Sequence, residues 1–196
     1  MRKLVLEVQM SIDGYIADKN GRTDWMLWNW GDEWPWDEEL RKYHTDLTAS
    51  ADCVLLSRKM AEEGFIHHWT AVAEKKNSPQ ADFAKKAADM RKVVFTKTLK
   101  KSVWENTVLA KGDIKEEVNK LKTEKGKSLI AYGGADFASS LIKADLIDEY
   151  HLIINPVVLG SGLSIFDKIN SPLNLSSVSS THYSCGITVL RYDRVA

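Results

Sequence analysis

Short apolar segments alternate with segments of helical periodicity along most of the chain, and this alternation limits the fold more than any other feature. Residues 3–10 read KLVLEVQM and place Leu4, Leu6, Val8 and Met10 on one face, which is the periodicity of a strand. Comparable apolar runs occur at residues 53–57, 92–96, 128–132 and 150–159. Strands that alternate with helices favour a mostly parallel sheet covered by helices on both faces.

Helix signals separate these runs. Pro35 suits a first helical turn, and the acidic residues that follow it suit the positive end of a helix. Ser78-Pro79 and Asp113 have the residue types of helix starts, and Gly126 of a helix end. Helices are therefore predicted at about 35–50, 58–64, 78–91, 113–126 and 135–144. The last part, from about 178 to 195, predicts an antiparallel hairpin around Cys185-Gly186.

Composition narrows the class of protein. A length of 196 residues fits a single domain over residues 1–196, and 27 basic residues balance 27 acidic ones. Zero net charge argues against a nucleic-acid partner. No segment approaches the roughly 20 apolar residues of a membrane span. The two distant cysteines, Cys53 and Cys185, favour a reducing, cytoplasmic setting. His44 and the pair His67-His68 lack the spacing of metal ligands, so no metal site is expected.

Three predicted strand ends carry the strongest site signal. Ser57-Arg58-Lys59, Thr96-Lys97-Thr98 and Tyr132-Gly133-Gly134 each follow an apolar run. Ligands of such sheets bind at the carboxyl ends of the strands. Two of the ends carry cations and the third offers bare backbone, so a phosphate-rich ligand would explain all three.

The glycine pair at 133–134 has two interpretations from the residues alone. It either permits a sharp turn, or it lets backbone approach an anion at the positive end of the helix that follows. The pair by itself does not decide between them.

At these residues the chain resembles the dihydrofolate reductase fold. It is most similar to the branch related to the reductase domain of bacterial riboflavin biosynthesis, the C-terminal part of a bifunctional deaminase-reductase. The stretches that carry the resemblance are SIDGYIA at 11–17, VLLSRKMAEEGF at 54–65, VVFTKTL at 93–99, YGGADFASSLIKADLIDEYHL at 132–152 and PVVLGSGLSIF at 156–166. Their order matches the family and spans nearly the whole chain. The ordered set is specific for the superfamily and not for one substrate.

The resemblance implies a site for NADPH. Arg58 and Lys59 match positions on the 2′-phosphate or diphosphate, and Lys97 is a second candidate for the 2′-phosphate. Ser57 stands where the family usually has glycine, and Met60 replaces a threonine whose hydroxyl would bind a phosphate. The full set of implied cofactor-binding residues is Ile16, Ala17, Ser57, Arg58, Lys59, Thr96, Lys97, Tyr132, Gly133, Gly134, Ala135, Asp136 and Phe137.

The substrate side is less defined. In dihydrofolate reductases an acid in the first long helix and a threonine on a central strand bind the pterin. Ile153 stands in the place of the threonine, so folate reduction is not expected. Asp37 is a candidate for the acid, and the alternative is that it decorates a helix N-terminus. Asp13 is a further candidate for the acid, and the alternative is that it holds a turn. Gly160 and Gly162 are candidates in a loop near the substrate end.

Five tryptophans crowd into twelve residues, at positions 25, 28, 30, 34 and 36. Trp25 and Trp28 are candidates for an aromatic lid that stacks on a flat heterocyclic substrate. Packing against the domain or a partner subunit is the equal alternative.

The resemblance therefore implies an NADPH-dependent reductase of a small heterocyclic molecule, similar to 5-amino-6-(5-phosphoribosylamino)uracil reductase. The substrate and the catalytic residues are not identified by the sequence. The branch implies a homodimer. The alternatives are a nucleotide-binding module without turnover, which Ser57, Met60 and the missing acid favour, and an interaction protein without a cofactor.

Overall fold

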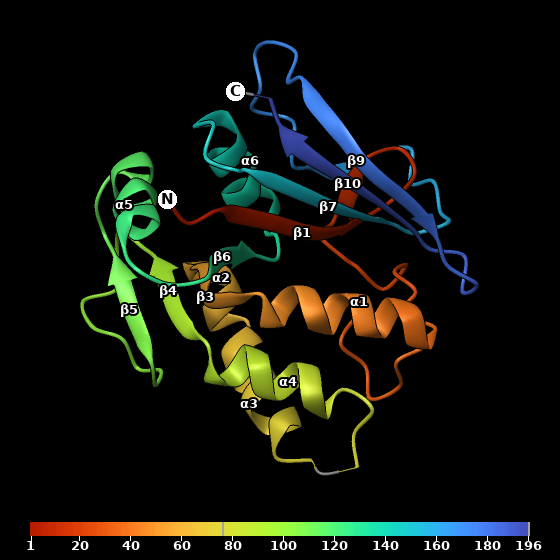
Figure 1. Cartoon of the computed structure of the whole chain (residues 1–196), viewed down its shortest axis with the longest axis horizontal. Coiled ribbons are helices and arrows are strands. Elements are labelled where there is room, and N and C mark those ends of the chain that lie inside the picture. The colour runs from red at the N-terminus through yellow and green to blue at the C-terminus, as the bar shows by residue number, and fades with distance from the viewer. Residues whose placement is uncertain (76, 196) are drawn as a thin grey trace.

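An eight-stranded sheet crosses the whole molecule in the order β5-β4-β3-β6-β1-β7-β10-β9 (Figure 1). This computed structural model describes residues 1–75 and 77–195. The strands are β1 (Leu4–Met10), β2 (Tyr15–Asp18), β3 (Ala51–Ser57), β4 (Arg91–Phe95), β5 (Thr107–Ala110), β6 (Ser128–Ala131), β7 (Glu149–Ile154), β8 (Gly162–Ser164), β9 (Leu175–His182) and β10 (Thr188–Arg194). The helices are α1 (Glu38–Ala49), α2 (Arg58–Glu62), α3 (Phe65–Ala73), α4 (Ala81–Asp89), α5 (Ile114–Thr123) and α6 (Ala135–Lys143).

Every pairing from β5 to β7 in this sheet is parallel, and β10 pairs antiparallel with both β7 and β9. The smaller sheet pairs β2 with β8. The predicted α/β fold of the dihydrofolate reductase type, with a mostly parallel sheet and a C-terminal antiparallel hairpin, is confirmed. Because the parallel strands run in the same direction, their carboxyl ends share one edge of the sheet.

The helices cover both faces of the sheet. In Figure 1, α1, α3 and α4 lie on one side, and α5 and α6 on the other. Trp69 and Phe83 belong to the apolar core under the first layer, and Val118 and Leu141 to the core under the second. The alternation in β1 explains this division, since Leu4, Leu6, Val8 and Met10 face α5 and α6, as the sequence predicts.

Several elements differ from the sequence prediction. Helix α1 begins after Asp37, so Pro35 precedes the helix instead of opening it. Helix α4 begins after Gln80, and the Ser78 hydroxyl accepts a bond from the Gln80 amide in the turn before it. Strand β7 ends at Ile154 instead of residue 159, close to Pro156, which has no amide hydrogen for a strand ladder. Helix α3 and strands β2, β5 and β8 were not predicted.

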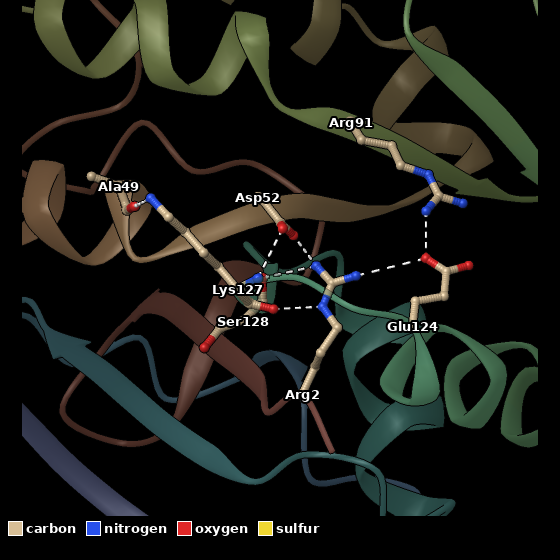
Figure 2. A network of polar contacts seen from close by, with 7 residues as sticks. All are labelled: Arg2, Ala49, Asp52, Arg91, Glu124, Lys127 and Ser128. Carbon is tan, nitrogen blue, oxygen red and sulfur yellow. Dashed lines mark hydrogen bonds and ion pairs between the residues drawn. The ribbon is translucent and has the colours of Figure 1, made fainter.

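A network of polar contacts joins the elements at the amino edge of the sheet (Figure 2). The guanidinium of Arg2 pairs with Asp52 of β3 and lies 3.7 Å from the Glu124 carboxylate beyond α5. The amide of Lys127 donates to Asp52 at 2.8 Å, and Arg91 of β4 pairs with Glu124 at 2.6 Å. These contacts hold the edge opposite the predicted site. Among the described helices, none is long and apolar enough to span a bilayer.

Candidate functional site

A cleft of about 1280 Å³ opens at the carboxyl edge of the parallel strands. Twelve of the thirteen predicted cofactor residues line it: Ile16, Ala17, Ser57, Arg58, Lys59, Thr96, Lys97, Tyr132, Gly134, Ala135, Asp136 and Phe137. Gly133 is not among the lining residues, although its neighbours on both sides are. The three strand ends singled out in the sequence therefore meet in one cavity.

At the end of β3, Ser57 stands where the family usually has glycine. Ser57 Oγ accepts a hydrogen bond of 3.1 Å from the Met60 amide and thereby caps α2. Arg58 pairs with Glu62 at 2.6 Å, one turn along the helix. Such exposed pairs contribute little stability, so the guanidinium can exchange its partner for a ligand at small cost.

The end of β4 supplies a second cation. Lys97 donates from Nζ to the carbonyl oxygens of Lys111 and Gly112, at 3.0 and 2.8 Å. Lys97 and Gly112 both line the cleft, so these bonds fix the ammonium at its wall. Thr96 Oγ1 accepts bonds from two amides of its own turn, those of Thr98 and Leu99, and so rigidifies this strand end.

The end of β6 exposes bare backbone. Gly133 and Gly134 have φ angles of 119° and 80°, in the region that side chains disfavour. Gly134 is the N-cap of α6, and no side chain caps this helix. The first amides of α6 are therefore free to bind an anion at the positive end of the helix. Ser57 Oγ would lie 3.6 Å from a Cβ on Gly134, so this turn also packs against the end of β3.

Ile16 and Ala17 lie on β2 of the small sheet, and both line the cleft. Both are buried. Gly162 of β8 does not line the cleft, and it has a structural role in holding β2. A Cβ at this position would lie 2.2 Å from the Ala17 carbonyl oxygen, so the pairing requires glycine.

The inner end of the cleft is aromatic. Trp28 and Ile153, two of the predicted substrate-side residues, line it, and Trp36 and Trp69 contribute to the same wall. Trp28 is only 3 % exposed and its ring centroid lies 4.9 Å from that of Trp36. These indoles therefore form a packed wall of the cleft and are not a free lid. Trp25 lies outside the lining residues, half-buried, with its Nε1 donating to the Arg22 carbonyl at 3.1 Å.

Asp37, Asp13 and Gly160 have structural roles outside the cleft lining. Asp37 is the N-cap of α1 and lies outside the cleft lining. The Asp13 carboxylate accepts the Gly160 amide at 2.7 Å, which joins the loop after β1 to the loop before β8. Gly160 itself has a φ of 72° and does not line the cleft. The turn interpretation of Asp13 agrees with this geometry.

A buried polar pair lies at the aromatic end of the cleft and was not predicted from the sequence. Glu7 of β1 and His44 of α1 both line the cleft, and Glu7 Oε1 lies 2.8 Å from His44 Nδ1. Beside them, the Tyr132 hydroxyl bonds Thr48 Oγ1 at 2.7 Å. Burial, reinforced by the charge of Glu7, raises the pKa of Tyr132 well above its ordinary value. The signal was the single carboxylate in β1, a strand whose other residues are apolar except Gln9.

The sequence profile of the RibD C-terminal domain matches residues 2–189. Two proteins of Bacillus subtilis (strain 168) are similar to the chain. The uncharacterized protein YyaP is 30 % identical over 193 residues, covering 97 % of this chain and 94 % of YyaP. The uncharacterized protein YwjB is 29 % identical over 174 residues, covering 89 % of this chain and 88 % of YwjB.

Solved structures share the fold. A putative riboflavin biosynthesis protein from Shewanella sp. PV-4 superposes with a TM-score of 0.70 at 22 % identity over the full length of both chains. A deaminase/5-amino-6-(5-phosphoribosylamino)uracil reductase from Thermotoga maritima gives a TM-score of 0.67 at 16 % identity, covering 99 % of this chain and 57 % of that one. The profile match extends over nearly the whole chain, and the chain belongs to the RibD C-terminal domain family.

Proposed function

We propose that this protein is an NADPH-dependent reductase of a small, planar heterocyclic molecule. The observation that carries the proposal is a single cleft with two different ends. One end combines Arg58, Lys59 and Lys97 with the free amides of α6, and the other is walled by indoles. Membership of the RibD C-terminal domain family supports a reductase.

The residues of the outer end fit a dinucleotide with phosphate groups. The uncapped start of α6 provides amide donors, and the glycine turn before it leaves room for close approach. In this assignment the diphosphate lies on the backbone from Ala135 to Phe137, and Arg58 or Lys97 binds the 2′-phosphate. When bound, NADPH supplies a hydride.

The chain's own contribution is then binding, orientation and the exclusion of water. Ile16 and Ala17 would cover the nicotinamide, because both are apolar residues that line the cleft. Trp28 and Trp36 would stack on the substrate ring and keep the reacting atoms in an apolar setting. The phosphoribosyl-substituted uracil named for the Thermotoga maritima protein is one candidate substrate class.

A nucleotide-binding module without turnover is the second candidate. It is favoured by Met60, which lines the cleft with a thioether where the family usually offers a hydroxyl, and by Ser57, which stands where the family usually has glycine. Turnover separates the two proposals.

The test is NADPH oxidation by the purified protein with a panel of oxidised, planar nitrogen heterocycles. Oxidation that needs both the protein and one heterocycle supports the reductase. Tight NADPH binding with no oxidation across the panel would favour the binding module instead.

A further inference from the structure

The buried pair formed by Glu7 and His44 has capacity for hydrogen bonding that no other described residue uses. Glu7 is 2 % exposed and His44 is 5 % exposed. Their one mutual contact joins Glu7 Oε1 to His44 Nδ1 at 2.8 Å. Glu7 Oε2 and His44 Nε2 are both buried and have no hydrogen-bond partner within residues 1–75 and 77–195.

The direction of the mutual bond follows from the chemistry of the two groups. An ionised carboxylate can only accept, so His44 Nδ1 carries the hydrogen and donates it to Oε1. Glu7 Oε2 is then an unused acceptor, whichever protonation state Nε2 has. A buried acceptor of this kind is costly unless something donates to it.

The hydroxyl groups of the two neighbouring tyrosines are committed elsewhere, whereas the indole nitrogens of Trp28 and Trp36 also have no hydrogen-bond partner among the described residues. Tyr132 bonds Thr48, and the Tyr43 hydroxyl bonds His151 Nδ1. His151 lies opposite Glu7 in the adjacent strand β7, and its second ring nitrogen faces Glu149 at 3.4 Å.

Aromatic rings hold the pair in place. The His44 ring stacks on Phe83 with centroids 4.2 Å apart, and meets Trp28 and Trp36 edge-on at 5.6 and 5.5 Å. All four of these residues line the cleft together with Glu7. A polar acceptor in an aromatic wall is the usual arrangement by which an apolar pocket selects the orientation of a ligand.

We propose that Glu7 is a specificity-determining residue, whose Oε2 accepts a hydrogen bond from an N–H group of a planar nitrogen heterocycle held against the aromatic wall of the cleft. His44 is a positioning residue, since it acts on the ligand through the Glu7 carboxylate. This inference rests on the proposed function, in that the aromatic end of the cleft is taken as the substrate end.

The first test changes the ligand and leaves the protein intact. Benzimidazole and benzothiazole are flat bicyclic rings of similar size, and only benzimidazole carries an N–H. Ligand-detected NMR titrations at a pH where both probes are neutral give the two affinities. We expect benzimidazole to bind about tenfold more tightly, the usual effect of one hydrogen bond to a charged group. Equal affinities would overturn the proposal and indicate that an ordered water satisfies Oε2.

The second test changes the pair. Glu7→Gln replaces the charged acceptor by a neutral amide of the same shape, and we expect the preference for benzimidazole to fall towards one. His44→Leu removes the donor that orients Glu7 and has the same expected result, whereas His44→Asn keeps an N–H near the position of Nδ1 and should restore the preference. Glu39→Gln makes the same chemical change as Glu7→Gln at an exposed position of α1 and should leave the preference unchanged.

The ratio of the two affinities separates recognition from folding. A variant that is merely destabilised weakens both probes equally and leaves the ratio intact. A ratio that survives Glu7→Gln would therefore contradict the proposal. An NADPH titration of the same samples distinguishes failure of this inference from failure of the proposed function. Normal NADPH binding without the N–H preference overturns only this inference, whereas absent NADPH binding counts against the proposed function.

Discussion

Asp37 Oδ2 accepts a hydrogen bond of 2.9 Å from Ser184 Oγ, which joins the start of α1 to the turn between β9 and β10. The same oxygen lies 3.3 Å from the Cys185 amide, and Oδ1 caps the helix by accepting the Leu40 amide at 2.9 Å. Burial alone would raise the pKa of Asp37, but these hydrogen bonds outweigh it and lower the pKa from its ordinary value. The carboxylate that resembled a substrate-binding acid in the sequence is thus committed to the scaffold.

Replacing Asp37 should therefore destabilise the protein. Asp37→Ala removes both the helix cap and the tie to the hairpin, and we expect a loss of about 1–2 kcal/mol in the free energy of unfolding. Urea unfolding measures it. Asp46→Ala, on the exposed side of the same helix, removes only a surface ion pair with Lys42 and should cost less than about 0.5 kcal/mol. Equal losses in the two variants would refute the structural role of Asp37.

Gly162 should not tolerate a side chain. In Gly162→Ala the added Cβ would lie 2.2 Å from the Ala17 carbonyl oxygen, so β2 and β8 must separate. We expect a loss of about 1–3 kcal/mol in the free energy of unfolding, as for other overpacked sites. Gly31→Ala is the matched control, because its nearest contact would be 3.9 Å away and its φ is not in the left-handed region. A Gly162→Ala protein as stable as wild type would show that the two strands do not pair as described.

Asp13 should make stability depend on pH in the acid range. The hydrogen bond from Ser11 lowers the pKa of Asp13 from 3.8. Desolvation opposes this shift, and the hydrogen bonds from the Leu159 and Gly160 amides reinforce it. The folded protein holds the proton of the Asp13 carboxyl less tightly than the unfolded chain does. The contribution of Asp13 to the free energy of unfolding is therefore fully present above pH 3.8, and it is lost as pH falls through the lowered pKa.

Asp13→Asn should therefore be less stable than wild type at neutral pH, and the difference should shrink in the most acidic range where folding persists. Thermal unfolding from neutral to acid pH follows both proteins. Asp24→Asn, at an exposed position before the tryptophans, is the control. A difference between Asp13→Asn and wild type that stays constant with pH would argue against the linkage.

Much of the fold follows from local pattern, and the missing parts depend on distant contacts. The central parallel strands β1, β3, β4, β6 and β7 were predictable as apolar runs, because both of their faces are covered. Strands β2, β5 and β8 have three or four residues each, too few for a periodicity, and they form through partners far away in sequence. Helix α3 did carry a signal, since Phe65, Ile66, Trp69 and Val72 are buried at helical spacing, but the two histidines between them read as a solvated segment.

In the candidate site, too, some residues follow from local sequence pattern and others depend on distant contacts. The strand ends were predictable, since glycines and cations directly after apolar runs need only the parallel sheet to bring them together. Glu7 and His44 were not. In a strand that alternates, Glu7 reads as solvent-facing, and its burial arises only when α1 packs over that face of β1. His44 was considered only as a metal ligand, and its partner lies 37 residues earlier.

The most direct test of the central claim is a titration of the purified protein with NADPH, with NADH as the comparison, followed by tryptophan fluorescence. Trp28, Trp36 and Trp69 line the cleft, so a cofactor that fills it should change their emission. We predict that NADPH binds more tightly than NADH. Loss of a cation that binds the 2′-phosphate, in Arg58→Ala, Lys59→Ala or Lys97→Ala, should reduce NADPH affinity about tenfold or more and leave NADH affinity nearly unchanged. Lys42→Ala, on the exposed side of α1, should change neither. Absence of binding by both cofactors at millimolar concentration would contradict the account, and so would NADPH binding that none of the three substitutions weakens.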